Sequence, residues 1–152
     1  MKKILIFLIF ALFSALSAQA YDFKSGDLYY NITGNNTAEV TYEDFTNFYT
    51  FSSVTIPDTV THNGITYRVT GIGMYALVNC LNLTSVSFSN SILSIGDNAF
   101  AGCKNLSYIA FGDSITSIGN AAFSNCAALT SFIIPNSVTN IGSQTFANCS
   151  GL

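Results

Sequence analysis

A unit of 23 residues that recurs from residue 69 to the end of the chain constrains the fold more than any other feature. A glycine, a cysteine and a leucine each return at this interval, as Gly73, Gly96, Gly119 and Gly142, then Cys80, Cys103, Cys126 and Cys149, then Leu83, Leu106, Leu129 and Leu152. A fixed period of this length is typical of stacked repeats, because one unit cannot bury its apolar face alone. We therefore expect three full repeats and one truncated repeat over residues 69–152.

Each unit is expected to combine a short strand with a short helix. Apolar residues that alternate with polar ones predict strands within residues 83–88, 106–111 and 129–134. Ala99, Phe100 and Cys103 are spaced as in one or two helical turns, and the recurring glycine indicates a tight bend. The fold predicted is an α+β repeat solenoid, in which neighbouring units stabilise one another by stacking.

The full pattern of the repeat is L-x-x-[VIF]-x-[FI]-x-x-S-[IV]-x-x-I-G-x-x-[AT]-[FL]-x-x-C-x-x-L, and residues 134–138 read IPNSV. This pattern resembles the leucine-rich repeat of the BspA-like bacterial surface antigens, over about residues 53–152. The resemblance implies a leucine-rich repeat fold and a role in surface adhesion or host contact, including contact with extracellular-matrix proteins. Ser91, Ser114 and Ser137 occupy the position where many other leucine-rich repeats carry Asn or Cys, which excludes the subclasses with an Asn ladder.

Residues 1–20 are predicted to be a secretory signal peptide. Lys2 and Lys3 precede 13 uncharged residues, 4–16, a stretch shorter than the roughly 20 residues that span a membrane. Ala18 and Ala20 supply the small residues of a cleavage site before Tyr21. The protein is therefore expected to be secreted or at the cell surface, with no membrane span after cleavage. An uncleaved anchor is the alternative.

Residues 21–68 differ from the repeats and are predicted to form an N-terminal β cap. Residues 28–32 and 37–42 are expected to pair as a hairpin, and Asn63-Gly64 marks the turn of a second hairpin. Such a cap would cover the open end of the apolar stack. The loop over residues 43–52 carries four aromatic residues, Phe45, Phe48, Tyr49 and Phe51. A contact surface in this loop is the functional alternative to a purely capping role.

Composition excludes some classes of partner. Only 9% of the residues are charged, against about 25% in typical soluble domains. After residue 20, eight acidic residues and three basic ones leave a net charge of −5. Nucleic acid is therefore excluded as a partner, since the proteins that bind it carry basic patches.

No catalytic, cofactor or metal site is predicted, and the protein is not expected to be an enzyme. The cysteines are too far apart in sequence for a zinc pattern, and His62 is the only histidine. His62 is expected to be a surface residue of the second hairpin. The cysteine ladder is expected to be one of buried thiols. Disulfides between neighbouring units are the alternative for an exported chain.

The outward side of the repeat strands is the predicted ligand face. Its residues are Ser85, Ser87, Tyr108, Ala110, Ser131 and Ile133. This face is neutral and rich in hydroxyl groups, which suits adaptable hydrogen bonding to an extracellular protein or glycan.

The leading hypothesis is an exported, non-catalytic binding module. The alternative is a structural spacer, or the N-terminal part of a longer surface protein whose recognition site lies elsewhere. The ligand, the mode of surface attachment and the oligomeric state do not follow from the sequence.

Overall fold

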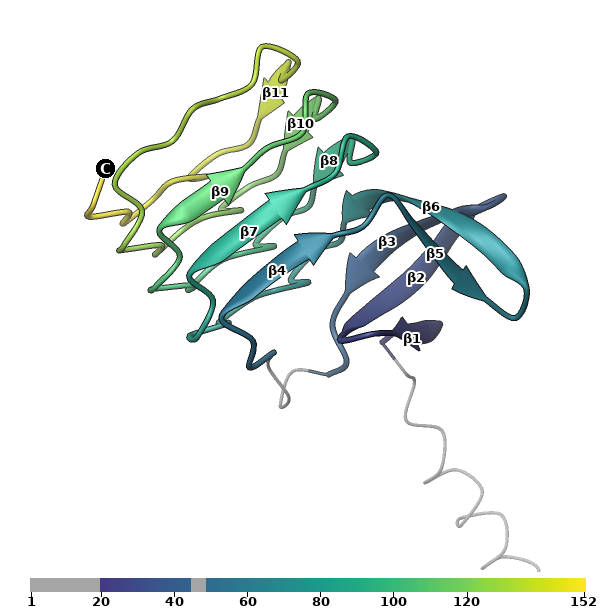
Figure 1. The fold of residues 1–152 in the computed structure, drawn as a ribbon. Helices are drawn as coiled ribbons and strands as arrows, with labels where there is room; N and C mark the ends of the chain where they lie inside the picture. The colour runs from purple at the N-terminus through teal and green to yellow at the C-terminus, as the bar shows by residue number, and fades with distance from the viewer. Residues whose placement is uncertain (1–19, 45–48) are drawn as a thin grey trace, which may run out of the picture.

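The computed structural model describes residues 20–44 and 49–152, and the predicted signal peptide falls almost wholly outside them. The described chain forms a β-rich cap followed by coils, each one 23-residue unit, stacked side by side (Figure 1). The largest sheet has eight strands in the order β1-β2-β3-β6-β8-β10-β11, with β5 paired to β6. A second sheet has the order β4-β7-β9.

The strand bounds follow the chain from the cap into the coils. The cap contributes β1 (Phe23–Ser25), β2 (Leu28–Gly34), β3 (Thr37–Thr41), β4 (Ser53–Ile56), β5 (Thr59–His62) and β6 (Ile65–Ile72). The coils contribute β7 (Ser85–Phe88), β8 (Ser94–Ile95), β9 (Tyr108–Ala110), β10 (Ser117–Ile118) and β11 (Asn140–Ile141).

Both hairpins predicted in the cap are present. Strands β2 and β3 pair antiparallel around Asn35 and Asn36, and Asn36 has a φ of 57°. Strands β5 and β6 pair antiparallel around Asn63 and Gly64, whose φ values are 50° and 77°. Two central residues with positive φ define a type I′ turn, which matches the twist of the flanking strands and explains the Asn-Gly pair.

Strand β6 connects the cap to the coils. Its C-terminal half pairs in parallel with β3 on one edge and with β8 on the other, so that Ile72 lies between Val40 and Ile95. The strand therefore runs through residue 68, where the sequence analysis divides the chain. Strand β4 also precedes that point, yet it pairs with β7 of the first full repeat.

The predicted short helix in each repeat is wrong, because the described residues contain no helix. Turns occupy residues 74–79, 97–102, 120–125 and 143–148 instead, here called the turn side. The second and sixth residues after each repeated glycine have positive φ, namely Tyr75, Asn98, Ala121 and Gln144, then Asn79, Gly102, Asn125 and Asn148. A right-handed helix needs negative φ throughout, so these positions prevent one from forming.

Backbone bonds between coils replace the hydrogen bonds of the expected helix. The N–H of Leu77 donates to the carbonyl of Ala99, that of Phe100 to Ala122, and that of Phe123 to Thr145, at 2.8 to 2.9 Å. Every second N–H on the turn side thus points along the stack. The spacing of apolar residues cannot distinguish these turns from a helix, because the same residues point inward in both.

The core is a column of side chains, one set from each coil. The rings of Phe100 and Phe123 stack at 5.2 Å, and those of Phe123 and Phe146 at 5.9 Å. The four cysteines are free and buried, as predicted. Each of the last three donates its thiol to a carbonyl of the preceding coil, Cys103 to Leu77 at 3.0 Å, Cys126 to Phe100 at 3.3 Å and Cys149 to Phe123 at 3.0 Å.

Candidate binding face

The parallel sheet β4-β7-β9 aligns outward side chains from successive coils. Its register places Ser53 beside Ser85 and Ser85 beside Tyr108, and then Thr55 beside Ser87 and Ser87 beside Ala110. The residues between them, Val54, Val86 and Ile109, point into the core or pack against it. The alternation predicted from the sequence therefore places Ser85, Ser87, Tyr108 and Ala110 together on one surface, here called the outer face together with Ser53, Thr55, Ser131 and Ile133.

The last two predicted face residues are not in a strand. Residues 131–135 form none, so the strand expected within residues 129–134 is wrong. Ser85 and Tyr108 donate their N–H to the preceding coil, at Ser52 and Thr84. Ser131 makes no equivalent bond within the described residues. The segment therefore does not pair with β9 as a further strand of this sheet.

A hollow opens where this ladder is missing. It has a volume of about 120 Å³ and is lined by Ser107, Tyr108, Ile109, Phe111, Ser131, Phe132 and Ile133. Phe132 still packs on the core, with its ring 5.1 Å from that of Phe111. The hollow therefore has an apolar floor and a rim that carries three hydroxyl side chains, those of Ser107, Tyr108 and Ser131.

Two large side chains project beside the hollow. Tyr108 is 61% exposed and Ile133 is 84% exposed, whereas Ser85, Ser87 and Ala110 are half-buried. None of the predicted face residues carries a charge. The recognition chemistry available here is therefore apolar contact together with hydrogen bonding by hydroxyl and backbone groups.

Sequence reasoning missed two members of this face, Ser53 and Thr55 on β4. Both are exposed, and both align with predicted residues across the ladder. The signal was present in the sequence, because Val54-Thr55-Ile56-Pro57 repeats the strand end at Ile134-Pro135. The hollow itself has no sequence signal, because it results from a ladder that fails to form.

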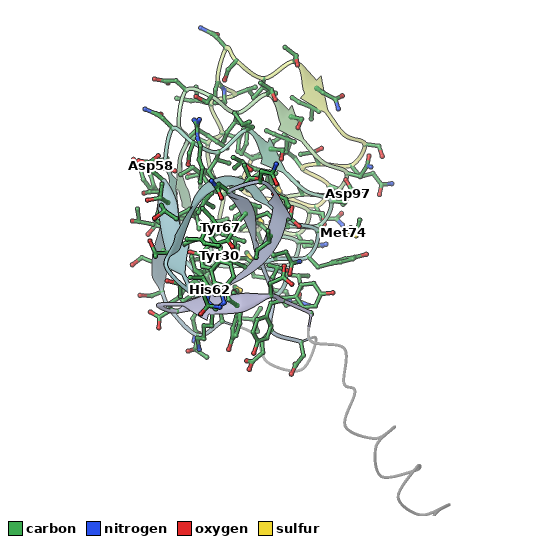
Figure 2. The ribbon with its side chains drawn as sticks, turned by 90° about the vertical axis from the view of Figure 1, so that its right-hand side faces the viewer. Tyr30, Asp58, His62, Tyr67, Met74 and Asp97 are labelled. Atoms are coloured by element: carbon green, nitrogen blue, oxygen red, sulfur yellow. The ribbon has the colours of Figure 1, made fainter. Side chains whose placement is uncertain are left out.

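The cap holds His62 in an aromatic cluster. Its ring stacks on Phe23 at 4.5 Å, and Phe23 also contacts the rings of Tyr30 and Tyr67. Figure 2 shows Tyr30, Tyr67 and His62 gathered inside the cap, with Met74 and Asp97 at the outer edge of the turn side. Within residues 20–44 and 49–152, no three His, Cys, Asp or Glu side chains are close enough to hold a metal ion.

The family is decided by comparison with known repeats. The family model described as the BspA type leucine rich repeat region matches residues 70–152 with six copies. The chain belongs to the BspA-type leucine-rich repeat family. The residues matched by the family model thus coincide with the coils, and the match begins inside β6 at the junction with the cap. No curated protein matches the chain.

Solved structures of bacterial leucine-rich repeat proteins share the fold. A protein from Bacteroides capillosus is 33% identical, with a TM-score of 0.70, over 78% of this chain and 86% of its own. One from Bacteroides ovatus is 31% identical with a TM-score of 0.70, over 87% of this chain and 40% of its own. The T. pallidum leucine-rich repeat protein is 24% identical with a TM-score of 0.65, over 86% of this chain and 69% of its own.

Among the residues described, none lies in a helix with the length and apolar character needed to cross a bilayer.

Proposed function

We propose that this BspA-type chain is an exported, non-catalytic binding module that contacts an extracellular macromolecule through its outer face. The observation that carries the proposal is the hollow of about 120 Å³ between β9 and residues 131–133, flanked by the exposed Tyr108 and Ile133. Exposed aromatic and aliphatic side chains around a small pocket are typical of the centres of protein interfaces.

A protein partner is favoured over a glycan at this face. The floor of the hollow is apolar, with Ile109, Phe111 and Phe132, and an apolar side chain of a partner would be desolvated there. The serines on the rim would accept and donate hydrogen bonds to a partner backbone. In the proposed complex, one apolar side chain of the partner fills the hollow and is surrounded by neutral polar contacts.

Binding of the purified chain to a panel of immobilised matrix proteins, such as fibronectin, laminin and collagen, tests this function. We expect one member to bind, and we expect Tyr108→Ala to weaken that binding by about tenfold, the effect of losing a well-packed anchor. Ser87→Arg should weaken it similarly by placing a bulky charge on the face. Absence of binding across the panel would favour a structural spacer instead.

Export is the second part of the proposal. Its support is the apolar segment 4–16 followed by Ala18 and Ala20. The intact mass of protein recovered from the native host tests it. A chain beginning at Tyr21 is expected, and a chain that retains residues 1–20 would contradict cleavage.

A further inference from the structure

The cap contains a second and larger hollow, away from the outer face. It has a volume of about 360 Å³, within the range of small-molecule sites. The side chains that define its chemistry are Lys24, Asp27, Tyr29, Glu43, Tyr49 and Phe51. They come from the β1–β2 hairpin, from the segment after β3 and from the segment before β4, so folding of the cap assembles them from three parts of the chain.

Hydrogen bonds and ring contacts within the protein hold the aromatic side chains of this hollow in place. The hydroxyl of Tyr49 donates to the carbonyl of Thr41 at 2.7 Å and accepts the N–H of Tyr29 at 3.0 Å. The ring of Tyr49 lies 5.9 Å from that of Tyr29 and 4.9 Å from that of Phe51. A ligand would therefore meet rings that are already in place, which reduces the entropic cost of binding.

Hydrogen bonds connect three polar side chains of the hollow, those of Lys24, Tyr29 and Glu43. Lys24 Nζ donates to the hydroxyl of Tyr29 at 3.2 Å. The Tyr29 hydroxyl is also hydrogen-bonded to Glu43, and this bond is the main reason that the pKa of Tyr29 is raised. The hydrogen bond to Tyr29 likewise raises the pKa of Lys24. Hydrogen-bond donors and acceptors thus stand side by side next to the aromatic rings.

This combination selects among classes of ligand. Two carboxyl groups, of Asp27 and Glu43, oppose an anionic ligand. A cationic ligand would have to displace Lys24 from the Tyr29 ring, because the ammonium of Lys24 already lies 4.7 Å from the ring centre. A neutral sugar avoids both conflicts, because each hydroxyl group both donates and accepts hydrogen bonds. The apolar C–H face of a sugar ring can also pack on aromatic side chains.

We propose that the hollow lined by Lys24, Asp27, Tyr29, Glu43, Tyr49 and Phe51 binds a neutral saccharide unit. The site is independent of the outer face, and it gives Tyr49 and Phe51 a role beyond capping. A module with both sites would bind a protein through its coils and a glycan through its cap.

Saturation-transfer NMR on the chain from Tyr21 to Leu152 tests the saccharide site. The probes are the neutral disaccharides lactose, maltose, cellobiose and mannobiose. Sialyllactose serves as the anionic comparison and glucosamine as the cationic one. We expect transfer to at least one neutral probe at concentrations up to about 10 mM, and weaker transfer to the charged probes.

Matched variants locate the site. Lys24→Met and Asp27→Asn change exposed side chains of the hollow, and Glu43→Gln replaces the carboxylate that accepts from the Tyr29 hydroxyl with a neutral amide. Each should weaken binding by about tenfold, the effect of losing a hydrogen bond to a charged group. Lys104→Met and Asp113→Asn make the same chemical changes on the exposed surface of the coils and should leave affinity unchanged. Tyr108→Ala should also leave it unchanged, which separates this site from the outer face.

Three results would overturn the inference. One is the absence of transfer to every neutral probe. Another is neutral binding that Lys24→Met and Asp27→Asn leave intact. The third is a preference for sialyllactose or glucosamine over all the neutral sugars. None of them bears on the binding of matrix proteins by the outer face.

Discussion

Phe123 lies at the centre of the core, where aromatic side chains from three coils meet. Its ring is 5.2 Å from that of Phe100, 5.3 Å from Phe132, 5.9 Å from Phe146 and 6.5 Å from Phe111. It is completely buried, like Phe100. Because rings of the preceding and the following coil pack against it, a cavity at Phe123 removes contacts on both sides of its coil.

Phe123→Ala is expected to lower the free energy of unfolding by about 3–5 kcal/mol, through lost burial and the cavity left behind. Phe100→Ala should have an effect of the same size. Denaturant unfolding checks both, with Leu81→Ala as the control because Leu81 is 52% exposed. A loss below about 1 kcal/mol for both phenylalanine variants would mean that the inward frame is wrong.

The buried thiols give stability a dependence on alkaline pH. Burial raises the pKa of Cys126 from its ordinary value of 9.0 to about 12. In the unfolded chain this thiol loses its proton at lower pH than in the folded chain. Its contribution to stability is therefore fully present below about pH 9 and is lost as the pH rises towards 12.

Replacing Cys126 by serine removes this titration while keeping a hydroxyl donor for the carbonyl of Phe100. Unfolding free energies between pH 9 and pH 11 should fall less steeply for Cys126→Ser than for the wild type. The difference in slope should approach about 1.4 kcal/mol per pH unit. Parallel curves would show that Cys126 is not buried as a thiol in the native state.

At the scale of single residues, the sequence predicted the core well. Ala99, Phe100 and Cys103, whose spacing indicated an inward side, are buried, as is Leu106. Ile109 and Phe111, at the end of the strand expected within residues 106–111, are half-buried and pack against the core. Apolar patterning succeeds here because it depends only on which side chains avoid water. It makes no distinction between the backbone conformations that can turn those side chains inward.

At the scale of elements, a helix was predicted on the turn side because apolar patterning does not distinguish a helix from these turns. Ala121 is a good helix former in isolation, yet its φ is 51°. The bond from the Ala121 N–H to Ser143 in the next coil holds it there. Asparagine at positions 79, 98, 125 and 148 was the available signal, because asparagine tolerates positive φ better than most residues.

The repeated glycine is needed for close approach between coils and not for the tight bend expected from the sequence, because none of Gly73, Gly96, Gly119 and Gly142 has a positive φ. A Cβ at Gly119 would lie 2.6 Å from the N of Asp97 and 2.7 Å from the carbonyl carbon of Gly96. Both are backbone atoms of the preceding coil. The glycine column therefore sets how closely neighbouring coils can approach along the stack.

Gly119→Ala is expected to destabilise the protein by about 1–3 kcal/mol, because the coils must separate to admit the methyl group. Thermal or denaturant unfolding measures the loss. Gly34→Ala is the control, since a Cβ there would meet only the flexible Thr37 side chain, at 3.0 Å. Equal effects of the two substitutions would argue against close contact between the coils at Gly119.

At the scale of the whole molecule, β6 and β4 make the cap and the coils one continuous structure. The hairpins of the cap were predictable because their turns are local in sequence. The hollow of the outer face and the hollow of the cap were not, because each depends on segments distant in sequence. The proposed division at residue 68 follows the change in sequence pattern, while β6 extends across it.

Recognition through the outer face is tested by paired isoleucine substitutions. Ile133 is 84% exposed beside the hollow, and Ile65 is 46% exposed on the hairpin of the cap. Kd is measured for the matrix protein that binds the wild-type chain. We predict that Ile133→Ala raises Kd by about tenfold, whereas Ile65→Ala changes it less than about twofold. Equal effects of the two substitutions, or an effect of Ile65→Ala alone, would contradict the assignment of the outer face.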